Sequence, residues 1–199
     1  MCLRCRRPLE RAARGPGLCG GCAAEIEREP GIAFAADGID SGYAPLAYDG
    51  PGRRLVAALK FSRLLVVAEL GAALIAEGAP GDGAVIVPVP GAPIRSLRRG
   101  FDPAWEIAAA LAGITGAELS PMLRRRDLRH QRGRPRHDRL AQPPAIEANG
   151  PAPPMALLVD DVVTTGATMT SSARALRAAG SARVDAVSIA AVRPRRIRG

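Results

Sequence analysis

The 199-residue chain is poor in aromatic residues, in lysine and in long apolar runs. Phe, Tyr and Trp make up only 3% of it, so it offers few rings on which nucleobases can stack. Lys60 is the single lysine among 28 basic residues, and neither G-x-x-x-x-G-K-[ST] nor G-x-G-x-x-G occurs, which excludes two common nucleotide-binding loops. No stretch approaches the roughly 20 apolar residues that cross a bilayer, so we expect no membrane insertion. The opening MCLRCRRPLE has no apolar core of a signal peptide, and we therefore expect a cytoplasmic protein.

The composition is otherwise that of a globular protein with an excess of positive charge. Hydrophobic residues make up 47% of the chain, enough for one domain with a sizeable core and a small satellite. The formal net charge is +9, which attracts phosphate groups of nucleotides or nucleic acids. This charge is uneven, because Arg124–Arg139 holds eight arginines and two histidines against two aspartates.

All four cysteines lie within the first 22 residues, as Cys2, Cys5, Cys19 and Cys22. Two C-x2-C pairs separated by thirteen residues are typical of a zinc ribbon, in which each pair directs two thiolates at one tetrahedral metal. A closed four-cysteine site has no open position for substrate, so we expect a structural zinc ion that contributes folding energy. Two disulfides or four free thiols are the alternatives, and a reducing compartment disfavours the disulfides.

Apolar runs alternate with helical periodicity along the rest of the chain. We expect a strand ending near Tyr48, strands over 84–90, 117–123, 155–161 and 183–192, and helices after Asp49, from Asp102 and over 168–181. Strands that alternate with helices predict an α/β fold with a doubly wound, mostly parallel sheet. We place a zinc ribbon at residues 1–35 and this larger domain at 36–199.

The string LLVDDVVTTGAT (residues 157–168) joins a buried strand to the start of a helix. Asp160 and Asp161 stand at the carboxyl end of the strand, where ligands bind in such sheets. The residues that follow form a lysine-free phosphate cradle from helix amides and hydroxyls; they are Thr164, Thr165, Gly166, Ala167 and Thr168. Two acids directly before a phosphate cradle suit a sugar phosphate, whose ring hydroxyls donate to them. An ordinary helix cap after a buried strand is the alternative.

A second basic loop follows the strand over 84–90. Arg95, Arg98 and Arg99 precede Gly100, and arginine supplies the delocalised charge that a pyrophosphate needs. We interpret these four residues as a pyrophosphate site, with an ordinary basic surface loop as the alternative.

At these residues the chain resembles a known superfamily. LLVDDVVTTGAT looks like the signature of the phosphoribosyltransferases, which bind 5-phosphoribosyl-1-pyrophosphate (PRPP) together with Mg²⁺. The resemblance implies that Asp160 and Asp161 hold the ribose hydroxyls and that Thr164–Thr168 hold the 5-phosphate. With the cysteine ribbon, YDGPGRRLVAALKF and VPVP…RRGF in the same order, residues 1–192 resemble the competence protein F (ComF-like) family. That family usually has asparagine and glutamine where this chain has Asp102 and Pro103.

The arginine-rich stretch over residues 123–140 is too charged to be expected as a packed element. It contains no aromatic residue, and we interpret it as a loop that closes over pyrophosphate, as a tract that binds a nucleic-acid backbone, or as a solvated loop without a partner.

Two hypotheses follow. The first is an enzyme that transfers the phosphoribosyl group of PRPP to an unidentified acceptor, with Mg²⁺ on the pyrophosphate. The second, implied by the family resemblance, is a protein of natural transformation that handles single-stranded DNA through Arg124–Arg139 beside a helicase-like partner, with the PRPP site as a sensor or scaffold. Lys60 and Gln131 match family positions, although their roles are not evident from the residues.

Overall fold

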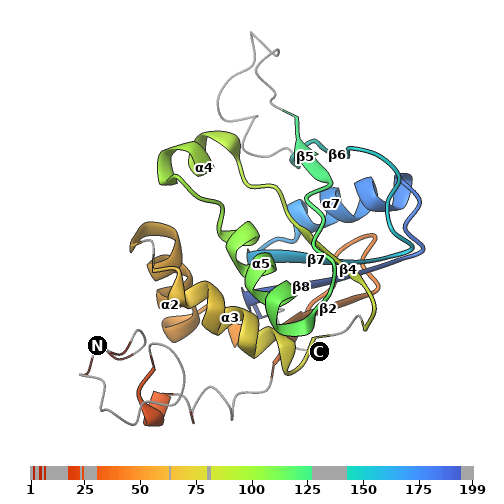
Figure 1. The fold of residues 1–199 in the computed structure, drawn as a ribbon. Helices are drawn as coiled ribbons and strands as arrows, with labels where there is room; N and C mark the ends of the chain where they lie inside the picture. Colours follow the sequence, from red (N-terminus) through yellow and green to blue (C-terminus); the bar gives the residue numbers. More distant parts are fainter. Residues whose placement is uncertain are drawn as a thin grey trace, which may run out of the picture.

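The structure, a computed structural model, describes Cys2, Cys5, Arg7, Ala24 and residues 18–22, 31–62, 64–79, 82–126 and 143–193. It is an α/β protein built on a mixed, mostly parallel sheet (Figure 1). The elements are β1 (Ile32–Ala33), β2 (Ser41–Ala44), β3 (Leu46–Ala47), α2 (Gly50–Ser62), α3 (Val66–Ala76), β4 (Val85–Pro88), α4 (Pro93–Arg99), α5 (Pro103–Thr115), β5 (Leu123–Arg125), β6 (Ile146–Ala148), β7 (Met155–Val163), α7 (Ala167–Ala178) and β8 (Arg183–Ala191).

The six-stranded sheet has the order β1-β2-β8-β7-β4, and β3 also pairs with β8. All of these pairings are parallel except that of β1 with β2. The long strands β7 and β8 form its centre, where most of their residues are buried on both faces of the sheet. The expected mostly parallel sheet is therefore confirmed.

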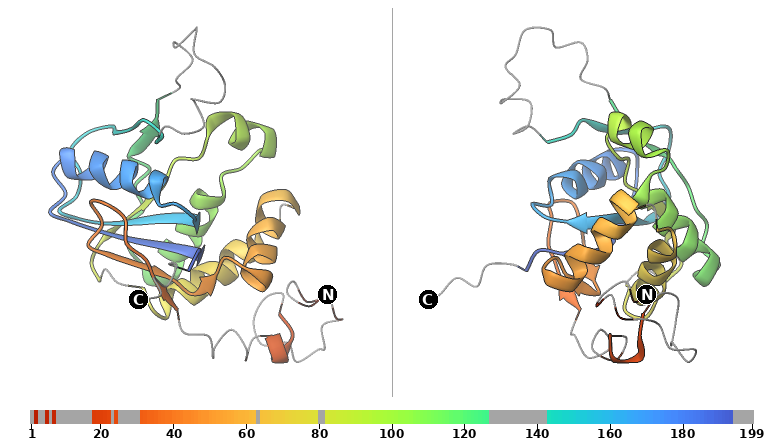
Figure 2. Two further views of the ribbon diagram at one scale, coloured as in Figure 1. Left: turned by 180° about the vertical axis from the view of Figure 1, so that it is seen from behind. Right: turned by 90° about the vertical axis from the view of Figure 1, so that its left-hand side faces the viewer.

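Helices cover both faces of this sheet, with α2, α3 and α5 on one side and α7 on the other (Figure 2). Along β7, Leu157 and Val159 face the first group of helices, while Ala156 and Leu158 pack on the side of α7. This alternation follows from the two-residue period of a strand.

The start of α5 shows how local sequence sets an element. Asp102 lies in an extended conformation at the N-cap, Pro103 occupies the first helical position, and the side chain of Asp102 accepts from the N–H of Ala104. The helix ends at Gly116, which has φ 71°. The helix expected from Asp102 is confirmed.

Two expectations about strands differ from the structure. Residues 117–123 form no continuous strand; Leu119 makes a single parallel bridge to Ile86, and β5 begins at Leu123. The arginine-rich stretch begins with a packed element, because β5 pairs antiparallel with β6. Charge did not prevent this pairing, since Leu123 is buried and Glu147 of β6 faces the neighbouring arginines.

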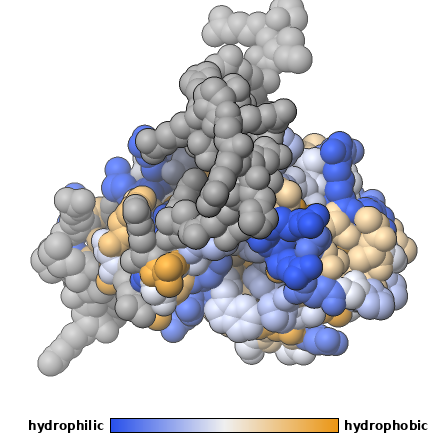
Figure 3. Space-filling model, turned by 90° about the horizontal axis from the view of Figure 1, so that it is seen from above, coloured by the Kyte–Doolittle hydropathy of each residue, from blue (hydrophilic) through white to orange (hydrophobic). Residues whose placement is uncertain are grey.

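The face seen from above combines strongly hydrophilic areas with small, separate hydrophobic ones (Figure 3). Among the described residues, no helix has the length and apolar character needed to span a lipid bilayer.

Candidate functional site

Two loops lie side by side at the carboxyl edge of the sheet because β4 and β7 are parallel neighbours. Pro88 at the end of β4 pairs with Val159, and the N–H of Val89 donates to the carbonyl of Val159 over 2.9 Å. The loop that leads from β4 to α4 therefore begins next to Asp160, and the loop from β7 to α7 follows directly after it. The structure thus brings together the two regions that the sequence indicated as anion sites.

A cavity of about 330 Å³, called here the central cavity, opens between these loops and the end of α2. Its charged lining residues are Lys60, Arg99, Asp102, Arg125, Asp160 and Asp161. Thr164 and Thr168 also line it, as does the hydroxyl-bearing Tyr48. The volume and the lining of three acidic and three basic side chains suit a small, polar ligand that carries charged groups.

The two aspartates have different neighbours in this cavity. Asp161 is buried and its Oδ2 lies 2.9 Å from Nζ of Lys60, which reaches it from α2. Asp160 remains partly exposed to the cavity, and its Oδ1 accepts the N–H of Asp161 over 2.8 Å. Among the described residues, Asp161 therefore has a full counter-charge in Lys60, and no cation forms an ion pair with Asp160.

This difference is reflected in the protonation of Asp160. Loss of surrounding water on burial raises the pKa of Asp160 well above its ordinary value, and the negative charge of Asp161 raises it further. The N–H of Asp161 and the charge of Lys60 oppose this rise. A ligand that brings hydroxyl donors or a cation to Asp160 would stabilise its charged form.

The loop after β7 forms a second, smaller cavity of about 40 Å³, lined by Asp160 and residues 162–169. Gly166, with φ 75°, is the N-cap of α7, and no side chain caps this helix. The first turn of α7 carries no acidic residue, and Thr165 makes only a local contact of 3.4 Å with the N–H of Ala167. The amino end of α7 thus carries the partial positive charge of a helix terminus, and all five predicted cradle residues line the smaller cavity beside it.

The four residues predicted to bind pyrophosphate have separate places. Arg99 lines the central cavity, and its guanidinium lies 5.5 Å from the ring centroid of Phe61. Gly100 ends α4 with φ 74° and donates its N–H to the carbonyl of Ser96. Arg95 and Arg98 lie on α4, and their side chains lie outside what the structure describes.

Sequence reasoning included Arg125 only as part of the arginine-rich stretch, without singling it out, and did not assign Tyr48 to the site. Arg124 and Arg126 pair with Glu147 of β6, whereas Arg125 between them lines the central cavity. Strand alternation would have separated Arg125 from its neighbours if β5 had been expected. Tyr48 follows β3 at the same edge of the sheet, and no motif in the sequence marks it as a site residue.

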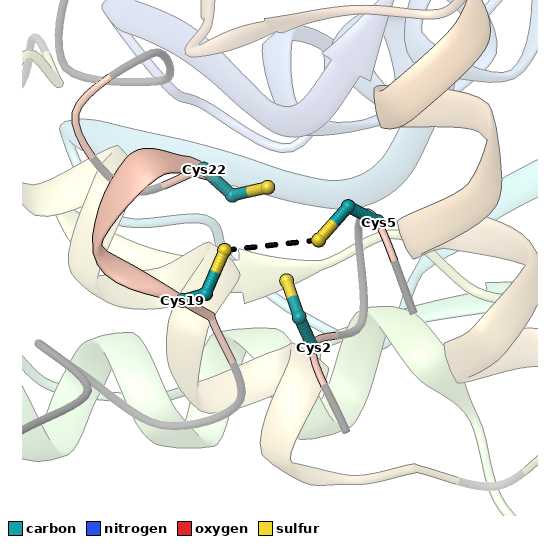
Figure 4. A group of neighbouring side chains, drawn as sticks. All are labelled: Cys2, Cys5, Cys19 and Cys22. Atoms are coloured by element: carbon teal, nitrogen blue, oxygen red, sulfur yellow. Dashed lines mark hydrogen bonds between the residues drawn. The ribbon is translucent and has the colours of Figure 1, made fainter. Parts of the chain in front are cut away.

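The four cysteines lie together at the N-terminus, beside α2 and α3 (Figure 4). Their sulfur atoms all lie within 4.8 Å of one another, and Sγ of Cys5 is 3.7 Å from Sγ of Cys19. A tetrahedral zinc site with Zn–S bonds of about 2.3 Å separates its sulfurs by about 3.8 Å, so the thiols could hold one metal ion such as zinc. No disulfide joins them. Burial, followed by contacts with the other three thiols, raises the pKa of Cys22 to about 12, so its thiolate needs a compensating cation.

No protein-family model and no curated protein sequence matches this chain.

Proposed function

We propose that the chain has a phosphoribosyltransferase fold and binds PRPP with Mg²⁺ in the central cavity, as a member of the ComF-like family. The observation that supports this most is the uncapped amino end of α7, which opens beside Asp160. A ligand with an anion at α7 and hydroxyl groups at Asp160 has the chemistry of a ribose 5-phosphate.

The distribution of the carboxylates agrees with such a ligand. Asp160 lines both cavities, so a sugar that follows the phosphate out of the smaller cavity meets this residue first. Lys60 neutralises Asp161, which limits the repulsion that two adjacent acids would exert on a phosphate. Asp160 would therefore accept hydrogen bonds from the ribose hydroxyls, and Asp161 would hold Lys60 at the edge of the cavity.

The remaining part of the central cavity would take the pyrophosphate. Arg99 supplies positive charge there, and Asp160 would hold Mg²⁺ together with oxygens of PRPP. This donor set fits the ion, because Mg²⁺ is usually bound by one or two carboxylates plus substrate phosphates and water. When bound, Mg²⁺ would neutralise charge on the leaving pyrophosphate. In a transfer reaction the C1–O bond to pyrophosphate breaks and an acceptor nitrogen forms the new bond at C1, while Asp160 stabilises the positive charge on the ring.

We propose a structural role for zinc in the four-cysteine cluster. Cys2, Leu18 and Cys22 belong to the same buried cluster as Leu55 and Leu59 of α2. Metal binding would therefore stabilise the surface on which α2 rests, and α2 in turn carries Lys60.

The role in DNA uptake, with single-stranded DNA at Arg124–Arg139 and a helicase-like partner, stays a prediction. Residues 127–142 lie outside the described residues, and Arg124 and Arg126 already have Glu147 as an ion-pair partner. No observation on the described residues favours it over PRPP binding.

Calorimetric titration of PRPP with Mg²⁺ tests the proposal, with released pyrophosphate measured in the same samples. Asp160→Asn should weaken binding by tenfold or more, since a charged acceptor contributes about 1.5–3 kcal/mol per hydrogen bond. Asp82→Asn is the matched control, because Asp82 is exposed at the amino end of β4, at the opposite edge of the sheet.

Binding that is lost in Asp160→Asn and kept in Asp82→Asn supports the site. Pyrophosphate released only with an added acceptor would make the protein an enzyme, and binding without release would make it a sensor or scaffold. Absence of PRPP binding by the wild type would refute the proposal.

A further inference from the structure

Asp102 joins three segments at the edge of the central cavity. Its Oδ1 caps α5 by accepting the N–H of Ala104 over 3.1 Å. Its Oδ2 accepts the N–H of Gly91 over 3.2 Å and the hydroxyl of Ser96 over 3.4 Å. One carboxylate therefore holds the loop after β4, helix α4 and the start of α5 together.

The contact with Gly91 is a close one. A Cβ placed on Gly91 would lie 2.7 Å from Oδ2 of Asp102 and 2.9 Å from Oγ of Ser96. The absence of a side chain at Gly91 is thus what lets the carboxylate reach the backbone amide. Gly91, Ser96 and Asp102 all line the central cavity, so this arrangement lies on its surface.

A backbone N–H and a hydroxyl that converge on one point, here from the loop after β4 and from α4, are donors of the kind that bind anions in proteins. Here both already donate to an anion, and that anion belongs to the chain itself. The charge of Asp102 also extends into the cavity, where it contributes to the raised pKa of Asp160 after burial and Asp161. A pyrophosphate that enters here would find the Gly91 N–H and the Ser96 hydroxyl already bound to Asp102, and the negative charge of Asp102 would repel it.

We infer that Asp102 is a specificity-determining residue that acts as an internal anion. Its carboxylate competes with pyrophosphate for the N–H of Gly91 and the hydroxyl of Ser96. It leaves unaffected the loop between β7 and α7, called here the 5-phosphate loop. This inference rests on the proposed function, because it assigns the two phosphate-bearing ends of the ligand to the two loops. The site then binds a ribose 5-phosphate group well and accepts a pyrophosphate only when Asp102 is displaced.

The test uses the full-length protein with its zinc, two simple probes and EDTA-free, magnesium-free buffer. Ribose 5-phosphate is titrated first, and inorganic pyrophosphate is then titrated with and without saturating ribose 5-phosphate, so that binding at the 5-phosphate loop is accounted for. Asp102→Asn keeps an oxygen for the cap of α5 and removes the charge, and Asp102→Ser is a second neutral cap. Asp82→Asn is again the control for a loss of charge elsewhere.

Both Asp102 variants should bind pyrophosphate about tenfold more tightly or better than wild type, as expected when a like charge within contact distance is removed. Their affinity for ribose 5-phosphate should stay within about twofold of wild type, and Asp82→Asn should leave both affinities unchanged. Thermal unfolding checks that each variant is folded.

Pyrophosphate affinity that is unchanged, lower or undetectable in both folded variants would overturn the inference. An equal gain for ribose 5-phosphate would also overturn it, because the effect would then be one of general charge. If no variant binds ribose 5-phosphate while pyrophosphate binding still tightens, the proposed function fails and the role of Asp102 as an internal anion stands.

Discussion

Replacing Lys60 with methionine is expected to destabilise the protein through Asp161. Methionine keeps the apolar stem of the side chain and removes only the charge, so packing on α2 changes little. The carboxylate of Asp161 then stays buried, with 8% of its side chain exposed, and loses the amino group that lies 2.9 Å away.

The expected cost follows from how much water reaches the pair. Breaking a fully buried ion pair costs about 3–5 kcal/mol, and an exposed pair contributes about 0–1 kcal/mol. The side chain of Lys60 is 21% exposed, which places this pair between the two limits. A loss of about 2 kcal/mol, or roughly 4–8 °C in Tm for a chain of this size, is therefore expected.

Urea unfolding with zinc held at saturation measures this loss, and Arg54→Met, on the exposed side of the same helix, should change stability by less than about 0.5 kcal/mol. The double variant Lys60→Met/Asp161→Asn should recover most of the loss, since the buried charge is then gone. A Lys60→Met protein as stable as wild type would refute the reasoning. So would a change in the free energy of unfolding on Asp161→Asn that is the same in the presence of Lys60 and in the Lys60→Met background.

Three further predictions concern the phosphate loop, Asp160 and the metal. Gly166→Ala should lower the free energy of unfolding by about 1–2 kcal/mol, because φ 75° is unfavourable for alanine, and it should weaken ribose 5-phosphate binding measured by calorimetry. The control Gly113→Ala, within α5, should leave stability unchanged or raise it. Folding raises the pKa of Asp160, so the contribution of this residue to stability should fall as pH rises above about 3.9. In urea unfolding, Asp160→Asn should therefore be more stable than wild type at pH 8 and lose this advantage toward pH 4, and an advantage that persists at pH 4 would contradict the linkage. If the four cysteines hold zinc as proposed, its chelation should lower the Tm of the whole chain by about 5–10 °C, because Cys2 and Cys22 share the core of α2 and α3. A separate early transition with an unchanged main Tm would contradict that coupling.

Local sequence was sufficient for features that depend on neighbouring residues. The Asp-Pro start of α5 could be placed because a helix cap is a property of a few consecutive residues. The strand that carries the acid pair was also expected, but β7 continues past Asp161 to Val163, so the two acids lie within its last part and not at its end. The spacing of the four cysteines likewise predicted their convergence, which the structure confirms.

The partners of these features could not be predicted, because they come from distant parts of the chain. Lys60 reaches Asp161 across more than 100 residues, and only the packing of α2 on the sheet brings them together. Asp102 was expected to begin a helix, but the hydrogen bonds of its second oxygen depend on how the loop after β4 folds back. The place of Arg125 in the cavity depends on strand β5, which was not expected in so highly charged a stretch.

The two adjacent aspartates can now be given separate roles within one site. Neighbouring residues of a strand project to opposite sides, and these two carboxylates accordingly meet different partners. Asp161 has Lys60, and Asp102 has Gly91, Ser96 and the cap of α5, so both charges are satisfied inside the chain. Asp160 combines a raised pKa with access to both cavities. Of the three acids at this edge of the sheet, Asp160 is therefore the one whose charged form gains most from a ligand, and its replacement should affect binding more than that of Asp161.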